Sequence, residues 1–189
     1  MVYSAHYVSP VGEIMLASDG GHVIGLWLEG QKYYAATVTA RTEEKPDLPV
    51  FLQAENWLDR YFRGEKPAVS ELPLAPVGSA FRQTVWEILC EIPYGATTTY
   101  GRIAVEAARR LKKASMSGQA VGGAVGHNPI SIIIPCHRVV GTDGSLTGYA
   151  GGIDKKLRLL AHEGVDISRL SVPATARRTG GAYRNFTNE

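Results

Sequence analysis

Cysteine is scarce in this chain of 189 residues, since only Cys90 and Cys136 occur and neither lies in a Cys-x-x-Cys pair. Two cysteines are too few for a zinc ribbon. Residues 1–6 lack the charged and apolar regions of a signal peptide, so we expect a reducing compartment that keeps both side chains as thiols. The scarcity excludes a disulfide scaffold and leaves the question of whether either thiol is reactive.

Apolar runs long enough to span a bilayer are also missing. Hydrophobic residues make up 44% of the chain and charged residues 20%, which is the balance of an ordinary globular protein. We therefore expect a cytoplasmic protein without a membrane partner.

The chain has little net charge, only +2, but its charged residues are unevenly distributed. Residues 1–78 carry six Lys and Arg against ten Asp and Glu, whereas residues 79–189 carry fourteen against eight. The uneven distribution indicates that a polyanionic partner, if there is one, binds the second part of the chain. The alternative is an unevenly distributed, solvated surface charge without a partner.

The first part of the chain has the pattern of a small sheet and a helix. Three short segments rich in Val, Ile, Tyr and Trp, separated by turn residues, predict an antiparallel meander over 2–8, 12–18 and 22–28. A short helix is predicted over 31–39, and apolar residues at helical spacing predict another over 50–63. Three prolines between 65 and 78 favour a lobe boundary there, so that 1–78 forms an N-terminal structural lobe.

The second part of the chain is mainly helical. Ser79 is a candidate N-cap, and Thr97-Thr98-Thr99 offers capping hydroxyls for a helix ending near residue 111. A polar break then leads to a helix of small residues over 117–126, which is a helix-turn-helix pattern, although many helical hairpins look alike and bind no DNA. A short helix is predicted over 154–163.

The prediction for the whole chain is an α/β protein: a small N-terminal sheet-and-helix lobe, a mainly helical lobe over 79–165, and a flexible tail over 166–189.

The chemistry centres on Cys136, which follows a proline and precedes His137 in a β-branched run. An imidazole that takes the proton of a thiol makes it a nucleophile. Adjacent side chains of a strand point in opposite directions, so the pair predicts a bend in the backbone. The alternative is an inert core cysteine, which is our interpretation of Cys90. Likewise, Trp27, Trp57 and Trp86 are predicted to be core residues.

A longer string carries a resemblance. Residues 128–141, Asn-Pro-Ile-Ser-Ile-Ile-Ile-Pro-Cys-His-Arg-Val-Val-Gly, closely resemble the active-site segment of the O6-alkylguanine-DNA alkyltransferases. The likeness extends through 148–152 and 159–164 and upstream to 81–86 and 92–101, and it covers roughly residues 79–165. The N-terminal lobe is similar only in size and coarse pattern.

The resemblance implies a single-turnover repair reaction in which Cys136 accepts the alkyl group from O6 of guanine. His137 would act as the base through a water molecule, oriented by Glu163. Tyr100 would donate a proton or hydrogen bond to guanine N3, and Asn128 would brace the turn before the nucleophile. If these roles do not hold, Tyr100 is a packed helix aromatic, Asn128 a turn former and Glu163 a surface residue.

The resemblance also implies a pocket and a DNA surface. The backbone of Cys136 and Val139 would bind the exocyclic amine of guanine, and Tyr149 and Ala150 would line the pocket. The target nucleotide must leave the duplex to reach a buried thiol. The helix-turn-helix would enter the minor groove, where small residues such as Ala120 and Gly123 permit close approach. Five basic residues are candidates for contacts with DNA phosphates: Arg102, Arg109, Arg110, Lys112 and Lys113. The alternative is that they form only a solvated helix face.

One position departs from the family pattern. Gln119 stands where the family commonly has an arginine that fills the gap left by the flipped base, and about five extra residues separate Tyr100 from Gln119. No cysteine precedes Cys90, so we expect no metal site, and the resemblance implies no cofactor. The expected partner is double-stranded DNA containing O6-alkylguanine, bound by a monomer.

Two other classes of function remain open. A lesion-binding protein without transfer activity would lack the acceptor cysteine. A thiol hydrolase using Cys136 and His137 would turn over repeatedly and would need an oxyanion site, which the sequence does not identify.

Overall fold

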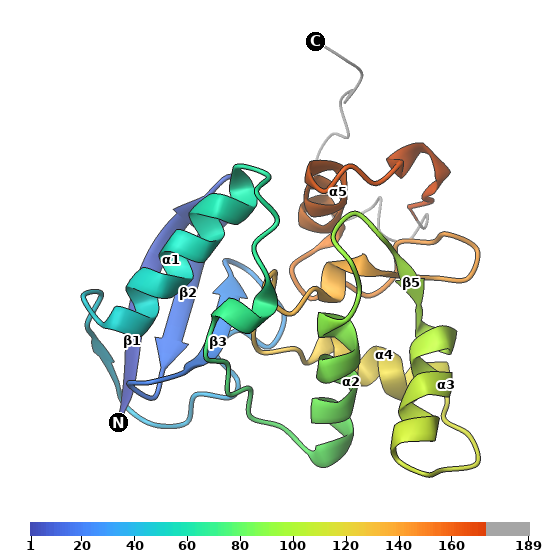
Figure 1. Cartoon of the computed structure of the whole chain (residues 1–189), viewed down its shortest axis with the longest axis horizontal. Helices are drawn as coiled ribbons and strands as arrows, with labels where there is room; N and C mark the ends of the chain where they lie inside the picture. The colour runs from blue at the N-terminus through green and yellow to red at the C-terminus, as the bar shows by residue number, and fades with distance from the viewer. Residues whose placement is uncertain (173–189) are drawn as a thin grey trace.

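The computed structural model describes residues 1–172 and begins with a four-stranded sheet. Strands β1 (Val2–Ser9), β2 (Gly12–Ser18) and β3 (Val23–Leu28) form the predicted antiparallel meander. A short fourth strand, β4 (Thr42–Glu44), pairs in parallel with β1 and gives the order β3-β2-β1-β4. Helix α1 (Pro49–Phe62) lies along the sheet and buries its apolar face, as the helical spacing predicted (Figure 1).

The segment between β3 and β4 corrects one prediction, because residues 31–39 form turns and no helix. Tyr33 and Ala35 have positive φ values of 62° and 52°, which a right-handed helix does not allow. The buried Gln31 side chain accepts hydrogen bonds from the Leu28 amide and the Ser131 hydroxyl. These long-range contacts hold the start of the segment and prevail over a weak local helical pattern.

The second lobe contains the predicted helices. Helices α2 (Ala80–Cys90), α3 (Tyr100–Arg110) and α4 (Gly118–Gly126) are capped by the hydroxyls of Ser79, Thr99 and Ser117, respectively. Helices α3 and α4 form the helix-turn-helix, and α2 packs against both. The Trp86 indole on α2 donates a hydrogen bond of 2.9 Å to the carbonyl of Ala124 on α4, which links α2 to α4.

Short elements complete the lobe. Two-residue strands β5 (Thr98–Thr99) and β6 (Val139–Val140) pair in parallel, with the 3-10 turn η2 (Cys136–Arg138) directly before β6. Helix α5 (Ile153–His162) follows, close to the predicted 154–163. The lobe is thus a helical assembly around the Cys136 turn (Figure 1).

The first residues of the predicted tail, 166–172, are folded against the rest of the chain. Residues 167–169 form the 3-10 helix η3 (Ile167–Arg169), and Leu170 packs on the small apolar cluster of Val140, Leu146 and Leu160. The amide of Leu146 donates to Ser171 O at 2.8 Å. The remainder of the predicted tail lies outside the described residues.

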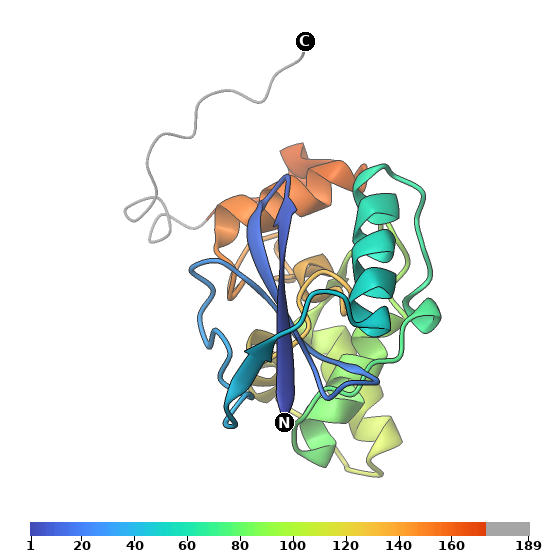
Figure 2. The ribbon, with the colours of Figure 1, turned by 90° about the vertical axis from the view of Figure 1, so that its left-hand side faces the viewer.

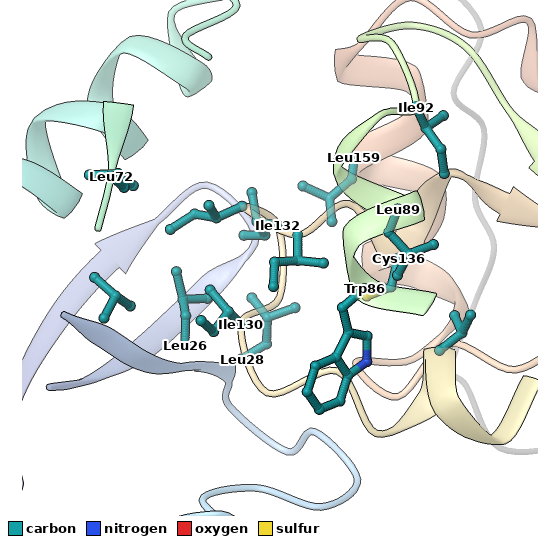
Figure 3. Close-up of a cluster of buried hydrophobic side chains, with 14 of the residues drawn as sticks. Leu26, Leu28, Leu72, Trp86, Leu89, Ile92, Ile130, Ile132, Cys136 and Leu159 are labelled. Atoms are coloured by element: carbon teal, nitrogen blue, oxygen red, sulfur yellow. The ribbon is translucent and has the colours of Figure 1, made fainter. Parts of the chain in front are cut away.

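The edge of β3 joins the two lobes. The Val23 amide donates to Pro73 O and the Leu26 amide to Pro129 O, each at 2.8 Å, and the Ser131 amide donates back to Leu26 O at 2.9 Å. The sheet therefore extends to the segment that leads to Cys136. Figure 3 shows the shared core, in which Leu26 and Leu28 from the sheet lie beside Ile130 and Ile132, with Trp86, Leu89 and Cys136 further along. The three tryptophans are buried, as predicted.

In Figure 1 the sheet and α1 lie on one side of the molecule and α2 to α4 on the other, and Figure 2 looks onto the side that carries the sheet. Within residues 1–172, none of the helices combines the length and apolarity needed to cross a membrane.

Gly25 permits the close packing of β3, because a methyl group there would overlap the indole ring of Trp27, which is buried on the same face. We expect Gly25→Ala to lower the free energy of unfolding by about 1–3 kcal/mol, the usual cost of overpacking. Urea denaturation measures this. Gly126→Ala is the matched control, because a methyl group there meets no atom within 4 Å; equal loss in both variants would contradict the packing argument.

Candidate active site

Cys136 is buried at the start of a tightly folded turn. Its amide donates to Ile134 O at 2.8 Å, and the Ile133 amide donates to Ser131 O at 2.8 Å. Ile132 has a φ of 68°, an unfavourable conformation for a β-branched residue, which must be held by its surroundings. The bend expected between Cys136 and its neighbours is therefore present, and it directs the sulfur into the core of the lobe.

Asn128 holds this turn through its side-chain amide. Nδ2 donates to Ile134 O at 2.8 Å and lies 3.1 Å from Cys136 Sγ, while Oδ1 accepts from the Ile130 amide at 3.0 Å. One buried side chain thus connects both ends of the loop with the sulfur atom. Its donor stabilises a thiolate more than a thiol, because hydrogen bonds to an ionised acceptor are stronger.

His137 and Glu163 form a buried pair. His137 Nε2 lies 2.6 Å from Glu163 Oε1, and since a carboxylate only accepts, Nε2 carries the proton. The other ring nitrogen, Nδ1, is buried and has no hydrogen-bond partner within residues 1–172. Burial lowers the pKa of His137 below its usual value, although the hydrogen bond to Glu163 opposes the shift. The ring is therefore neutral at physiological pH, with Nδ1 able to accept a proton.

Arg138 neutralises the carboxylate of Glu163. Its Nε donates to Oε2 at 2.8 Å and its Nη2 to Oε1 at 3.0 Å, and both side chains are buried. Burial alone would raise the pKa of Glu163, but the hydrogen bonds from His137 and Arg138 outweigh it and hold this pKa well below its usual value. Glu163 therefore stays ionised beside His137.

The charge state of Cys136 depends on this environment. Burial raises the pKa of the thiol, while the Asn128 hydrogen bond and the positive charge of Lys156 lower it, and the net direction is upward. The thiol is thus protonated near neutral pH, and a nucleophilic thiolate requires a base.

Lys156 is a site residue that sequence reasoning missed. Its Nζ is buried and donates to Val139 O at 2.6 Å and Thr147 O at 3.3 Å. Burial lowers its pKa to about 8, and the neighbouring Cys136 opposes this shift. A lysine on the apolar face of the predicted 154–163 helix was the available signal.

Two of the predicted pocket residues, Tyr100 and Tyr149, lie close enough to Cys136 for its charge to raise the pKa of their hydroxyls. Tyr100 donates its hydroxyl to Thr147 O at 2.8 Å. Tyr149 is buried, and burial together with the negative charges of Cys136 and Glu163 raises the pKa of its hydroxyl well above the usual value. Ala150 is half-buried, and its carbonyl accepts from the Lys32 amide of the N-terminal lobe at 2.9 Å. Val139 O keeps a second lone pair for a ligand besides the Lys156 bond.

The predicted DNA-binding residues form a separate, exposed surface on the helix-turn-helix. Gln119, Ala120 and Gly123 are exposed on α4, and Arg102 is exposed in the first turn of α3. Helix α4 also reaches the site, because a Cβ on Gly122 would lie 3.8 Å from the Tyr100 ring. Of the further basic candidates, Arg109 and Arg110 are engaged in ion pairs, both with Glu106 and Arg110 also with Glu91.

Comparison with known protein families identifies both parts of the chain. Residues 2–76 match the model described as "6-O-methylguanine DNA methyltransferase, ribonuclease-like domain", and residues 80–165 match its "DNA binding domain". The chain belongs to the 6-O-methylguanine DNA methyltransferase family. The resemblance seen in 79–165 is confirmed, and the family match also includes the N-terminal lobe.

Individual members of the 6-O-methylguanine DNA methyltransferase family support this. A methylated-DNA–protein-cysteine methyltransferase of Haemophilus influenzae is 42% identical over 86% of each chain. One from Methanosarcina acetivorans is 44% identical over 86% of this chain and 99% of its own. The crystal structure of Mycobacterium tuberculosis OGT in complex with DNA has a TM-score of 0.74 and 38% identity, and covers 91% of this chain and 96% of that one.

The predicted activity is thereby confirmed: the chain is a methylated-DNA–protein-cysteine methyltransferase that repairs O6-methylguanine in DNA. Among residues 1–172, no group of three or more His, Cys, Asp or Glu side chains is arranged to hold a metal ion.

Glu163 provides a pH test of the buried network. Its pKa is lower in the folded than in the unfolded chain, so its stabilising effect is complete above the unfolded value of about 4.3 and is lost as the pH falls further. We expect Glu163→Gln to lower the free energy of unfolding at neutral pH by about 3–5 kcal/mol, because Arg138 loses its buried counter-ion. The variant should also lose less stability on acidification to about pH 3 than the parent.

Urea denaturation at several pH values measures both effects. Glu106→Gln is the control, because it breaks ion pairs that solvent screens at the surface and should cost far less stability than Glu163→Gln. An acid-induced loss of stability equally steep in Glu163→Gln and the parent would contradict the assignment.

Proposed function

We propose that Cys136 is the alkyl acceptor of this methyltransferase and that His137 is its base. The thiol proton passes to His137 Nδ1 through a water molecule, and the thiolate attacks the alkyl carbon in line with O6 of guanine. The sulfur–carbon bond forms as the carbon–O6 bond breaks, and guanine leaves with the electron pair and recovers a proton. The thioether does not revert, so each molecule acts once.

The observation that carries this proposal is the arrangement around the sulfur. Cys136 is the only cysteine that lies beside a buried polar donor and a neutral imidazole within one turn, with Asn128 Nδ2 3.1 Å from Sγ. The raised pKa of the thiol makes a base necessary, and the His137–Glu163 pair supplies one. Cys90, in contrast, has its pKa raised to about 11 by burial and by the nearby charges of Glu87 and Glu91.

The remaining residues bind and release the base. Tyr100 exchanges its bond to Thr147 O for guanine N3 and eases departure of the base. Val139 and Cys136 offer backbone carbonyls to the exocyclic amine, and Tyr149 and Ala150 line the pocket. This proposal is supported by the burial of Tyr149 and the hydrogen-bonding capacity of Tyr100.

The substrate is double-stranded DNA containing O6-alkylguanine, bound by a monomer in the cytoplasm. Helix α4 presents Ala120 and Gly123 to the minor groove, Gln119 fills the gap left by the flipped nucleotide, and Arg102 contacts a phosphate. The exposure of all four residues supports this interface. Residues 1–78 serve as a structural lobe and 79–165 as the catalytic and DNA-binding lobe.

The first test uses mass spectrometry after incubation with a duplex that carries one O6-methylguanine. We expect one methyl group per molecule, located on the Cys136 peptide, and none on Cys136→Ala. Methylation of Cys90 or of another residue would refute the acceptor assignment. Binding without a mass change would favour a lesion sensor, and repeated turnover on esters would favour a thiol hydrolase.

A second test concerns Gln119, which brings no charge to the proposed gap in the duplex. We expect Gln119→Arg to bind lesion-containing duplex about 3- to 10-fold more tightly. The slope of log affinity against log salt concentration should become steeper by about one unit, because one more phosphate is neutralised. Fluorescence anisotropy in a Cys136→Ser background measures the affinity. Transfer from a single-stranded oligonucleotide should change less, because no base pair has to be opened.

Gln83→Arg is the matched control for Gln119→Arg, since Gln83 is an exposed glutamine on α2 outside the proposed interface. An equal gain in affinity from both variants would mean that added charge alone is responsible, and Gln119 would not be a flipping residue.

A further inference from the structure

Tyr61 connects the N-terminal lobe to the buried pair. It lies on α1, 1% exposed, and donates its hydroxyl to Glu163 Oε1 at 2.8 Å. The ring stacks on Trp57 with centroids 5.5 Å apart and meets Phe62 edge-on at 5.1 Å. A ring packed in this way cannot swing, so the hydroxyl stays at a fixed point beside the carboxylate.

The oxygen that Tyr61 contacts is the one that holds the base. Glu163 Oε1 also accepts from His137 Nε2 at 2.6 Å and from Arg138 at 3.0 Å. Oε2 accepts from Arg138 at 2.8 Å and from the Gly95 amide at 3.1 Å. The donors from η2 and the Gly95 turn belong to the second lobe, and Tyr61 alone comes from the first.

We propose that Tyr61 is a positioning residue for alkyl transfer: its hydroxyl holds Glu163 in the orientation in which Oε1 keeps the His137 ring directed at Cys136. This inference rests on the proposed role of His137 as the base. The N-terminal lobe thereby takes part in the reaction, through one hydroxyl group, without touching the DNA base.

The hydroxyl also limits the negative charge that His137 experiences. Without it, Oε1 has one donor fewer, so the imidazolium form is favoured and the pKa of His137 rises. A protonated ring cannot accept the thiol proton, and the acidic limb of the pH–rate profile should therefore move to higher pH.

The other charged and titratable groups around this cluster remain unchanged in such a variant. They come from η2, the turn after α2, the segment before α5, and α5 itself, and comprise Arg138, Cys136, Tyr94, Tyr149, His162 and Lys156. A shift in the profile of a Tyr61 variant is thus attributable to the lost hydroxyl.

The test is Tyr61→Phe, which retains the packed ring. Single-turnover transfer from O6-methylguanine duplex at saturating DNA is measured across the titration range of histidine. We expect the rate at neutral pH to fall about tenfold, which is less than the roughly 10²–10⁴-fold that a general base contributes. We also expect the acidic limb of the pH–rate profile to move to higher pH by about half a unit or more. A slower rate with an unshifted profile would overturn the proposal, as would an unchanged rate.

Tyr94→Phe is the matched control. It removes a hydroxyl from a neighbouring ring, 5.9 Å from that of Tyr61, whose hydrogen bond of 3.2 Å goes to His162 O and not to Glu163. We expect its pH profile to coincide with that of the parent. An equal shift in Tyr94→Phe would assign the effect to general loosening of the aromatic cluster and refute a specific role for Tyr61.

Two further measurements keep the test independent of stability and of turnover. In a double-mutant cycle, Tyr61→Phe should have little additional effect in a Glu163→Gln background, and full additivity would overturn the proposal. NMR titration of the His137 side chain without DNA should show the raised pKa in Tyr61→Phe. If the parent itself transfers no methyl group, the proposed function fails, and this titration still decides the inference about Tyr61.

Discussion

The carboxylate of Glu163 is the point on which the rest of the site depends. It is buried and ionised, a combination that a protein tolerates only when the charge is paired and its lone pairs are occupied. Tyr61 from α1, Gly95 from the turn after α2, and His137 and Arg138 from η2 all donate to it. One buried charge at the end of α5 therefore holds three other parts of the chain around it.

The second constraint is the compact path of the chain from Asn128 to Cys136. Asn128 takes the place of regular secondary structure by providing hydrogen bonds to the carbonyl of Ile134 and the amide of Ile130. This permits the unfavourable conformation of Ile132 and leaves the sulfur in a buried, polar environment. The sharp turn thus combines a strained backbone with a buried sulfur beside a hydrogen-bond donor.

Local patterns in the sequence predicted most of the elements. Candidate caps at Ser79 and Thr97–Thr99, the small residues of 117–126 and the apolar spacing in 50–63 predicted helices whose predicted ends agree with the structure within about two residues. The short strand β4 was missed because its exposed residues Thr42–Glu44 lack apolar alternation. The helix expected over 31–39 was wrong because Gln31 is held by partners up to 100 residues away.

The site was predictable only in part. Cys136 and His137 were singled out as neighbours in the sequence, whereas Glu163 was named only through the resemblance, since no local pattern relates it to His137 26 positions away. Tyr61 and Lys156 were not named, because a tyrosine or lysine on an apolar helix face gives no indication of which distant group its polar end will meet.

The contacts between the lobes have a consequence for how the chain can be divided. Strand β3 pairs with residues 129–131, Gln31 bonds to Ser131, and Tyr61 bonds to Glu163. Separation of the lobes would leave polar groups on both cut surfaces without partners. We therefore expect the two lobes to unfold together, and a chimera that takes them from different relatives to need these pairs exchanged together.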